Sequence, residues 1–251
     1  MTAARSLTRL FLVLATLASA GWAAFFLSHS DNSVQLDNIA NRIMSGNGFQ
    51  QKPLSGSEQL LEAAEGRALC NPLEMRGAAI VRLRLVEDAI DASDTHLADQ
   101  RLKSLRTSVD LALGCAPTEG FLWFIRYWGA IHSGGSASDH FQEIRMSYVL
   151  APFEGWIALR RSPYALAIYD SLPADIKEMA VNEFVAIVAS GFIGEAAKIL
   201  RGPGWPIRDQ LLPRLDKARL KLRLQFDKAL RAQEMIVDIP GVEPKEFRPW
   251  Q

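Results

Sequence analysis

A phrase of ten residues occurs twice in this 251-residue chain and limits what the chain can fold into. Residues 115–124 read CAPTEGFLWF and residues 150–159 read LAPFEGWIAL, so the second copy begins 35 residues after the first. Both copies share an Ala-Pro-x-Glu-Gly core. A repeat of this length is typical of stacked helix pairs, because a single pair cannot bury its own apolar face. We therefore expect an all-α fold, built as a short solenoid of antiparallel helix hairpins.

Helical periodicity continues outside the repeated phrase, and no segment has a convincing strand pattern. Apolar residues recur at helical spacing over residues 73–90 and 95–113, which predicts an antiparallel hairpin. A polar linker is expected over 28–34 and a helix break at Ser162-Pro163. Further helices are expected over about 36–44, 57–69, 118–131, 139–150, 152–161, 164–169, 173–190, 193–200 and 211–233.

The N-terminus carries an uncharged run of 18 residues, Leu10–Leu27, preceded by Arg5 and Arg9. This length is near the lower limit for a bilayer span, about 17–25 residues. We interpret residues 1–30 as a cytoplasmic stub followed by a transmembrane anchor. The alternative is a signal peptide cleaved after Ala18-Ser19-Ala20, although the apolar run continues past that site.

Both interpretations place the rest of the chain outside the cytoplasm, since basic residues before a span stay on the cytoplasmic side. We expect a single-pass protein of the bacterial inner membrane, attached through residues 10–27, with its C-terminal domain in the periplasm. Residues 31–235 would form the helical repeat domain. Residues 236–251, which contain three prolines, would form an extended tail.

The only two cysteines, Cys70 and Cys115, form a possible disulfide. An oxidising compartment permits such a bond. However, each cysteine precedes a proline by two residues, and equivalent positions of stacked repeats lie about 10 Å apart. A disulfide requires Cα atoms within about 7 Å. The compartment thus favours pairing, strict stacking disfavours it, and the sequence leaves the question open.

The repeated motif resembles the tetratricopeptide family over about residues 70–170. Pro117 and Pro152 resemble the proline at that family's repeat junction, and Trp123 resembles the aromatic residue of its first helix. Bulky Tyr127 departs from the small residue that the family prefers in the first helix. The resemblance implies helix–turn–helix units of about 34 residues that bind other proteins.

One N-terminal span followed by a small helical domain is also similar to membrane-anchored accessory proteins of bacterial envelope polysaccharide systems. This resemblance implies a role in polysaccharide biosynthesis or export. The implied partners are other membrane or periplasmic envelope proteins. Nucleic acid is not an expected partner, because the 28 basic and 28 acidic residues leave no net positive charge.

Acidic and histidine residues give no convincing active site. Glu74, Glu119 and Glu154 each lie two residues after a proline, and carboxylates that recur at helix starts fit capping and the helix dipole better than chemistry. His132 and His140 flank a Gly/Ser turn, but a metal site needs three or four ligands. We therefore expect no enzyme activity, catalytic residue, metal ligand or cofactor.

Aromatic and basic residues around the repeat give the candidate partner-binding groove. Its residues are Trp123, Arg126, Tyr127, Trp156 and Arg161. Ordinary packing between repeats is the alternative for the aromatic side chains, because aromatics at helical spacing usually fill cores.

A second basic segment covers residues 214–231 and has two interpretations. Its cations suit an anionic lipid or glycan, but Leu215, Leu222 and Phe226 form a core stripe, which favours a solvated helix face.

The sequence as a whole predicts a membrane-anchored, non-enzymatic scaffold or interaction protein of the cell envelope. The alternative is a secreted periplasmic binding protein after cleavage of a signal peptide. A glycan hydrolase would need a tight carboxylate pair in a deep cleft, and the sequence gives no evidence for one.

Overall fold

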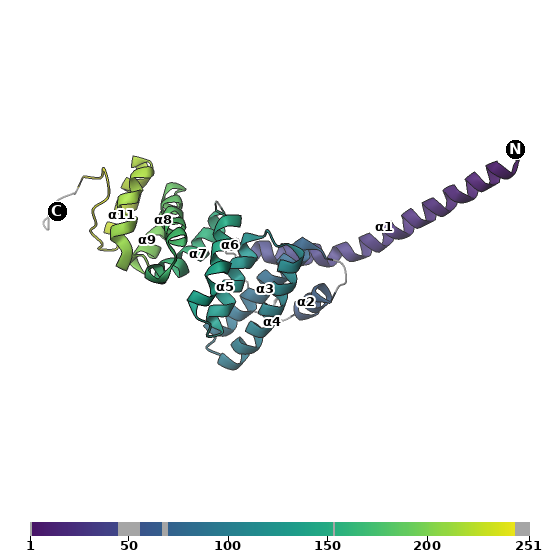
Figure 1. The fold of residues 1–251 in the computed structure, drawn as a ribbon, viewed down its shortest axis with the longest axis horizontal. Helices are drawn as coiled ribbons and strands as arrows, with labels where there is room; N and C mark the ends of the chain where they lie inside the picture. Colours follow the sequence, from purple (N-terminus) through teal and green to yellow (C-terminus); the bar gives the residue numbers. More distant parts are fainter. Residues whose placement is uncertain (1, 45–55, 67–69, 153, 244–251) are drawn as a thin grey trace. The chain divides into compact units, whose positions relative to one another are not determined.

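The computed structural model describes the backbone of residues 2–44, 56–66, 70–152 and 154–243, with all of their side chains except those of 2–10 and 25–33. Every regular element in these residues is a helix (Figure 1), so the predicted all-α class is confirmed. The chain forms two compact units, Met1–Pro117 and Thr118–Gln251. The range predicted as one repeat domain, 31–235, is therefore divided between the two units.

Helix α1 (Thr2–Met44) runs without a break from the apolar N-terminal segment into the core of the first unit. The linker predicted over 28–34 is wrong, because the backbone stays helical there and the next turns pack on α3. Leu36 and Ala40, one turn apart, are fully buried. Figure 1 shows the N-terminal part of α1 running clear of helices α2–α4. Within the residues that the structure describes in full, no helix is both long enough and apolar enough to cross a membrane.

Helices α3 (Pro72–Asp91) and α4 (Thr95–Cys115) form the predicted hairpin at the centre of the first unit. Pro72 opens α3, where its missing N–H costs nothing. Asp94 caps α4 by accepting a hydrogen bond from the Leu97 N–H at 2.9 Å. Helix α3 is buried on most sides and contacts α1, α2 and α4, so it is the central helix of this unit.

Helix α2 (Glu58–Glu65) is held on α3 by the buried side chain of Arg82. The Arg82 guanidinium donates from Nε and Nη2 to both carboxylate oxygens of Glu65, at 3.0 and 2.9 Å, and from Nη1 to Glu58 at 2.6 Å. Burial opposes the positive charge, but the two carboxylates outweigh it and raise the pKa of Arg82. The contact is a fork-shaped ion pair whose geometry fixes α2 in place.

A disulfide joins Cys70 and Cys115 in the first unit, with Cα atoms 5.6 Å apart. The stacking distance that disfavoured this bond does not apply, because the two cysteines do not occupy equivalent positions of parallel repeats. Cys70 lies two residues before the start of α3, whereas Cys115 is the last residue of α4. The start of one helix and the end of the next lie side by side in an antiparallel hairpin, within reach of a disulfide.

The second unit packs short helices mostly against their neighbours in the sequence. Helix α5 packs on α6, α7 on α8, and α9 on both α8 and α11. The elements are α5 (Gly120–His132), η1 (Ala137–His140), α6 (Phe141–Leu150), α7 (Gly155–Ala167), η2 (Tyr169–Ser171), α8 (Ala174–Ala189), α9 (Ile193–Arg201), η3 (Trp205–Ile207), α10 (Arg208–Leu211), η4 (Pro213–Lys217) and α11 (Leu220–Arg231).

Two predicted boundaries in this unit are wrong. Helix α7 continues through Pro163, because the buried residues around the proline outweigh its cost of about 3 kcal/mol in a helix interior. The single helix expected over 211–233 is interrupted, since Ala218 is buried with an extended backbone (φ −86°, ψ 151°) and α11 begins only at Leu220.

The repeated phrase forms the same helix-to-helix connection in both copies. Ala116 and Ala151 end the preceding helices with nearly equal dihedrals, φ/ψ −136°/71° and −137°/60°. Glu119 and Glu154 are the N-cap residues of α5 and α7, again with matching values of −78°/101° and −81°/94°. The helix that follows each copy begins at the glycine of the shared core, so the repeat in sequence is a repeat in backbone conformation.

Candidate functional site

The five residues of the predicted groove do not share one accessible surface. Tyr127 and Arg161 are buried, Trp123 and Trp156 are half-buried, and Arg126 is exposed. A partner cannot contact the two buried side chains directly, so they belong to the core of the second unit and not to a binding surface.

Trp156 and Tyr127 contact neighbouring side chains inside the second unit. The Trp156 ring on α7 meets the Phe121 ring on α5 edge to face, with centroids 4.4 Å apart. Burial, together with the neighbouring Tyr164, raises the pKa of Tyr127 to about 12. The Trp128 Nε1–H donates to the Tyr164 hydroxyl at 2.7 Å, which ties α5 to α7 a second time.

Arg161 is fully buried, with 0% of its surface exposed, a value that Glu74 alone among the other charged residues of the described chain shares. It forms an ion pair with Glu183 on α8, donates to Ser147 Oγ at 2.8 Å and to the Ala151 carbonyl at 3.2 Å. Its guanidinium also lies over the Tyr148 ring, 3.9 Å from the centroid. These contacts join α6, α7 and α8 at one point.

Burial raises the pKa of the Glu183 carboxyl, and the Arg161 charge acts in the opposite direction. No pattern in the sequence indicates this pair, because the partners lie 22 positions apart on different helices. Arg126 lies 35 residues before Arg161, at the offset of the repeated phrase. Arg126 is instead exposed, with its guanidinium 5.8 Å from the centroid of the Trp123 ring.

The carboxylates and histidines singled out in the sequence are dispersed. Glu119 and Glu154 occupy helix starts but make no side-chain cap, and the Glu154 carboxylate instead accepts from Trp156 Nε1 at 3.2 Å. His132 stacks on Trp128, while His140 lies 3.2 Å from its neighbour Glu143.

Glu74 is buried in the first turn of α3. Within the described residues, no three His, Cys, Asp or Glu side chains come together as a metal site would require.

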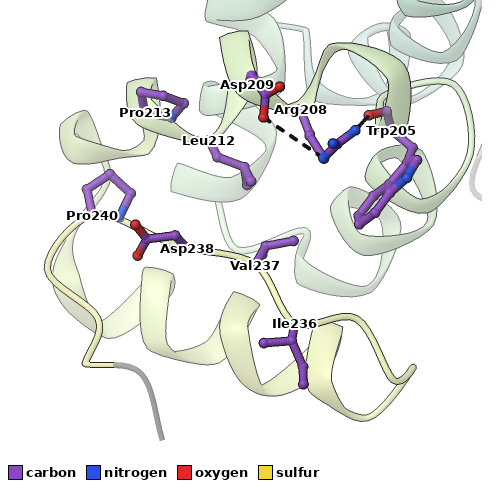
Figure 2. Close-up of a pocket in the computed structure, with 9 residues that line it drawn as sticks. All are labelled: Trp205, Arg208, Asp209, Leu212, Pro213, Ile236, Val237, Asp238 and Pro240. Atoms are coloured by element: carbon purple, nitrogen blue, oxygen red, sulfur yellow. Dashed lines mark hydrogen bonds and ion pairs between the residues drawn. The ribbon is translucent and has the colours of Figure 1, made fainter.

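A hollow of about 640 Å³ on the second unit could receive a ligand. Figure 2 shows that two segments form it, one running through η3, α10 and the start of η4, and the other following α11. Its lining combines apolar side chains with one cation and two carboxylates: Trp205, Arg208, Asp209, Leu212, Pro213, Ile236, Val237, Asp238 and Pro240.

Trp205 and Arg208 form a fixed pair at one side of the hollow. The guanidinium lies 4.8 Å from the centroid of the indole, and its Nη1–H donates to the Trp205 carbonyl at 3.0 Å. Asp209 lies 3.9 Å from the same guanidinium and is mostly exposed. Trp205 as a whole is 37% exposed, so part of its surface remains available to a ligand.

The opposite side of the hollow comes from the segment predicted as an extended tail. Residues 236–243 contain no helix, and Ile239 is buried while Ile236 is 66% exposed. The Arg223 side chain donates to the Pro240 carbonyl and holds this segment on α11. Asp209 and Asp238 therefore reach the hollow from two different segments (Figure 2).

This arrangement suits binding by apolar contact and by hydrogen bonds to carboxylates. The lining contains two carboxylates, and it contains no serine, threonine, cysteine, lysine or histidine. No family model matches the sequence, and no curated protein or solved structure is significantly similar to it.

Proposed function

We propose that this chain is a membrane-anchored, non-enzymatic scaffold of the bacterial envelope that holds a partner protein in the periplasm. The observation that carries the proposal is the continuity of α1, which joins an apolar, exposed segment to the buried core of the first unit.

The exposed segment of α1 is apolar on all its sides. The large side chains described there are 53–70% exposed, although a soluble protein rarely exposes a contiguous apolar surface of this kind. They are Phe11, Leu12, Val13, Leu14, Leu17 and Trp22. Together with the uncharged sequence Leu10–Leu27, they support insertion of this segment in the inner membrane.

The disulfide between Cys70 and Cys115 supports a periplasmic location for the first unit. Disulfides persist in oxidising compartments and are rare in the cytosol. The basic residues Arg5 and Arg9, which precede the apolar run, support the same orientation because they favour the cytoplasmic side.

The partner in this proposal is another membrane or periplasmic envelope protein that binds at the hollow formed by η3, α10 and residues 236–240. Exposed Trp205 and Ile236 supply the kind of anchor that dominates protein interfaces. The matching connections at Ala116 and Ala151 support a tetratricopeptide-like stack. The order of an N-terminal apolar segment followed by a small helical domain favours a polysaccharide biosynthesis or export system.

The anchor is tested by fractionating membranes of cells that express the full chain. We expect the protein to resist alkaline and high-salt extraction, to need detergent for release, and to keep its original N-terminus. A Leu14→Arg/Leu17→Arg variant should leave the membrane fraction. A control variant with two exposed residues of α4 changed, Lys103→Glu/Arg106→Glu, should stay in the membrane fraction. A soluble protein whose N-terminus follows Ala20 would instead support the secreted alternative.

The partner site is tested by placing a photo-crosslinking amino acid at Ile236 and, as a control, at exposed Leu111 on the first unit. We expect a discrete crosslinked envelope protein only from position 236. Trp205→Ala should reduce its yield without changing the melting temperature. Equal crosslinking from both positions would show that the hollow does not select a partner.

A further inference from the structure

Helix α11 presents an exposed face that combines lysines with leucines. Leu220, Lys221, Leu224, Gln225 and Lys228 are exposed and fall on one arc of the helix, at the helical spacing of one, three and four residues. The opposite arc packs in the core through residues that include Phe226 and Leu230, both fully buried. The exposed arc is therefore fixed in orientation by the fold.

The charges on this face have one sign. Lys217 and Arg219, just before the helix, are also exposed, as is one carboxylate, Asp216. None of these cations or the two lysines of the helix forms an ion pair with a described residue. The single carboxylate within the helix, Asp227, is buried and paired with Arg231 at 2.8 Å. The chain as a whole has no net charge, so this basic face is a local concentration.

The leucines distinguish between possible anionic partners. Leu220 and Leu224 are 48% and 50% exposed, one turn apart beside the lysines. A phosphate-rich lipid surface can use both features, because lysines bind headgroups while apolar side chains enter the acyl boundary. A soluble anionic polysaccharide offers no apolar layer for the leucines.

We propose that the exposed face of α11, defined by Leu220, Lys221, Leu224, Gln225 and Lys228, binds the surface of an anionic lipid bilayer. This inference goes beyond the anchoring proposed for α1, since α11 belongs to the second unit and its lipid contact depends on different side chains. The contact requires anionic headgroups, whereas insertion of the apolar segment of α1 does not.

The test places a polarity-sensitive dye on the full chain through Gln225→Cys, which keeps both leucines and both lysines. The native cysteines are joined to each other and leave this thiol as the labelling site. The labelled protein is mixed with lipid nanodiscs of phosphatidylcholine alone or of phosphatidylcholine with phosphatidylglycerol. Co-elution with neutral discs reports anchoring, and the dye spectrum reports the contact of α11.

We expect a blue shift of the dye only with phosphatidylglycerol. Lys221→Glu/Lys228→Glu should weaken the contact by at least about 30-fold, because the loss of each lysine costs about 1 kcal/mol and the anionic headgroups repel each added glutamate. Leu220→Ser/Leu224→Ser should also reduce the shift, and Lys103→Glu/Arg106→Glu on α4 should not, although it changes the net charge equally.

Three outcomes would overturn the inference. The dye could keep its spectrum in phosphatidylglycerol discs, or shift equally in neutral discs. It could also respond to dextran sulfate as strongly as to phosphatidylglycerol, which would assign the face to anionic polymers in place of lipid. Failure to co-elute with neutral discs would count against the anchor alone, because the dye shift with anionic discs would still be measurable.

Discussion

Gly120, the first residue of α5, lies directly against Ala151 at the end of α6. A β-carbon on Gly120 would come within 2.5 Å of the Ala151 Cβ and 3.0 Å of its backbone nitrogen. The equivalent glycine of the second copy, Gly155, faces only the edge of the Phe192 ring, at 3.2 Å. The same residue of the repeated phrase thus performs different packing roles in its two copies.

This difference predicts unequal effects of the same substitution. Gly120→Ala should lower the free energy of unfolding by about 2–3 kcal/mol, because a backbone must move to relieve the overlap. Gly155→Ala should change it by less than about 1 kcal/mol, since the Phe192 ring can turn aside and alanine favours a helix. Urea unfolding of both variants measures the contrast, and equal losses would show that Gly120 has no special contact.

The buried ion pair predicts a similar contrast between the two arginines of the repeat. Arg161→Met should cost about 3–5 kcal/mol, because it leaves the Glu183 carboxyl buried without its partner. Arg126→Met should cost less than about 0.5 kcal/mol, since Arg126 is exposed. The double variant Arg161→Met/Glu183→Leu should recover most of the loss, and a double variant as unstable as the single one would contradict this account.

The raised pKa of Tyr127 leads us to expect that the folded protein loses stability at high pH. Its pKa is raised from 10.0 to about 12 in the folded chain, so the folded state keeps a proton that the unfolded state loses. The free energy of unfolding therefore falls as the pH rises between these values, by about 1–2 kcal/mol after allowance for solvent screening. Tyr127→Phe should lose less stability over this interval. Parallel curves for the two proteins, measured by urea unfolding at each pH, would rule out this contribution.

The disulfide closes a loop with a sequence separation of 45 residues. Cys70→Ser/Cys115→Ser should lower the free energy of unfolding by about 2–4 kcal/mol, because the unfolded chain regains the freedom of that loop. A reductant should bring the parent protein to the same value and leave the double variant unchanged. Two free thiols in the parent under oxidising conditions would argue against the bond.

The sequence predicted helices well where capping and apolar period agree. Pro72 and Asp94 begin helices at the expected places, because each provides a local reason for a start. Prediction failed where tertiary packing decides: α7 passes through Pro163, and the chain breaks at Ala218, which carries no turn signal. The polar stretch over 28–34 also lacks any residue that would forbid a helix.

The candidate site was harder to predict than the fold. Trp123 and Arg161 were both predicted as groove residues, but Trp123 is half-buried and Arg161 is fully buried. The burial of a side chain depends on neighbours that lie far away in the sequence. The observed hollow combines residues near Trp205 with residues near Ile236, and neither segment carries a motif. The tertiary fold brings these two segments together, and their spacing in the sequence does not indicate that contact.

The unbroken course of α1 makes the first unit a rigid extension of its N-terminal segment. A helix transmits rotation, because each added residue turns everything beyond it by about 100°. One alanine inserted between residues 24 and 34 would therefore swing the first unit around the helix axis while every contact within it stayed intact. The facing direction of Leu36, and of the α3–α4 hairpin packed around it, is thus set by the number of residues in α1.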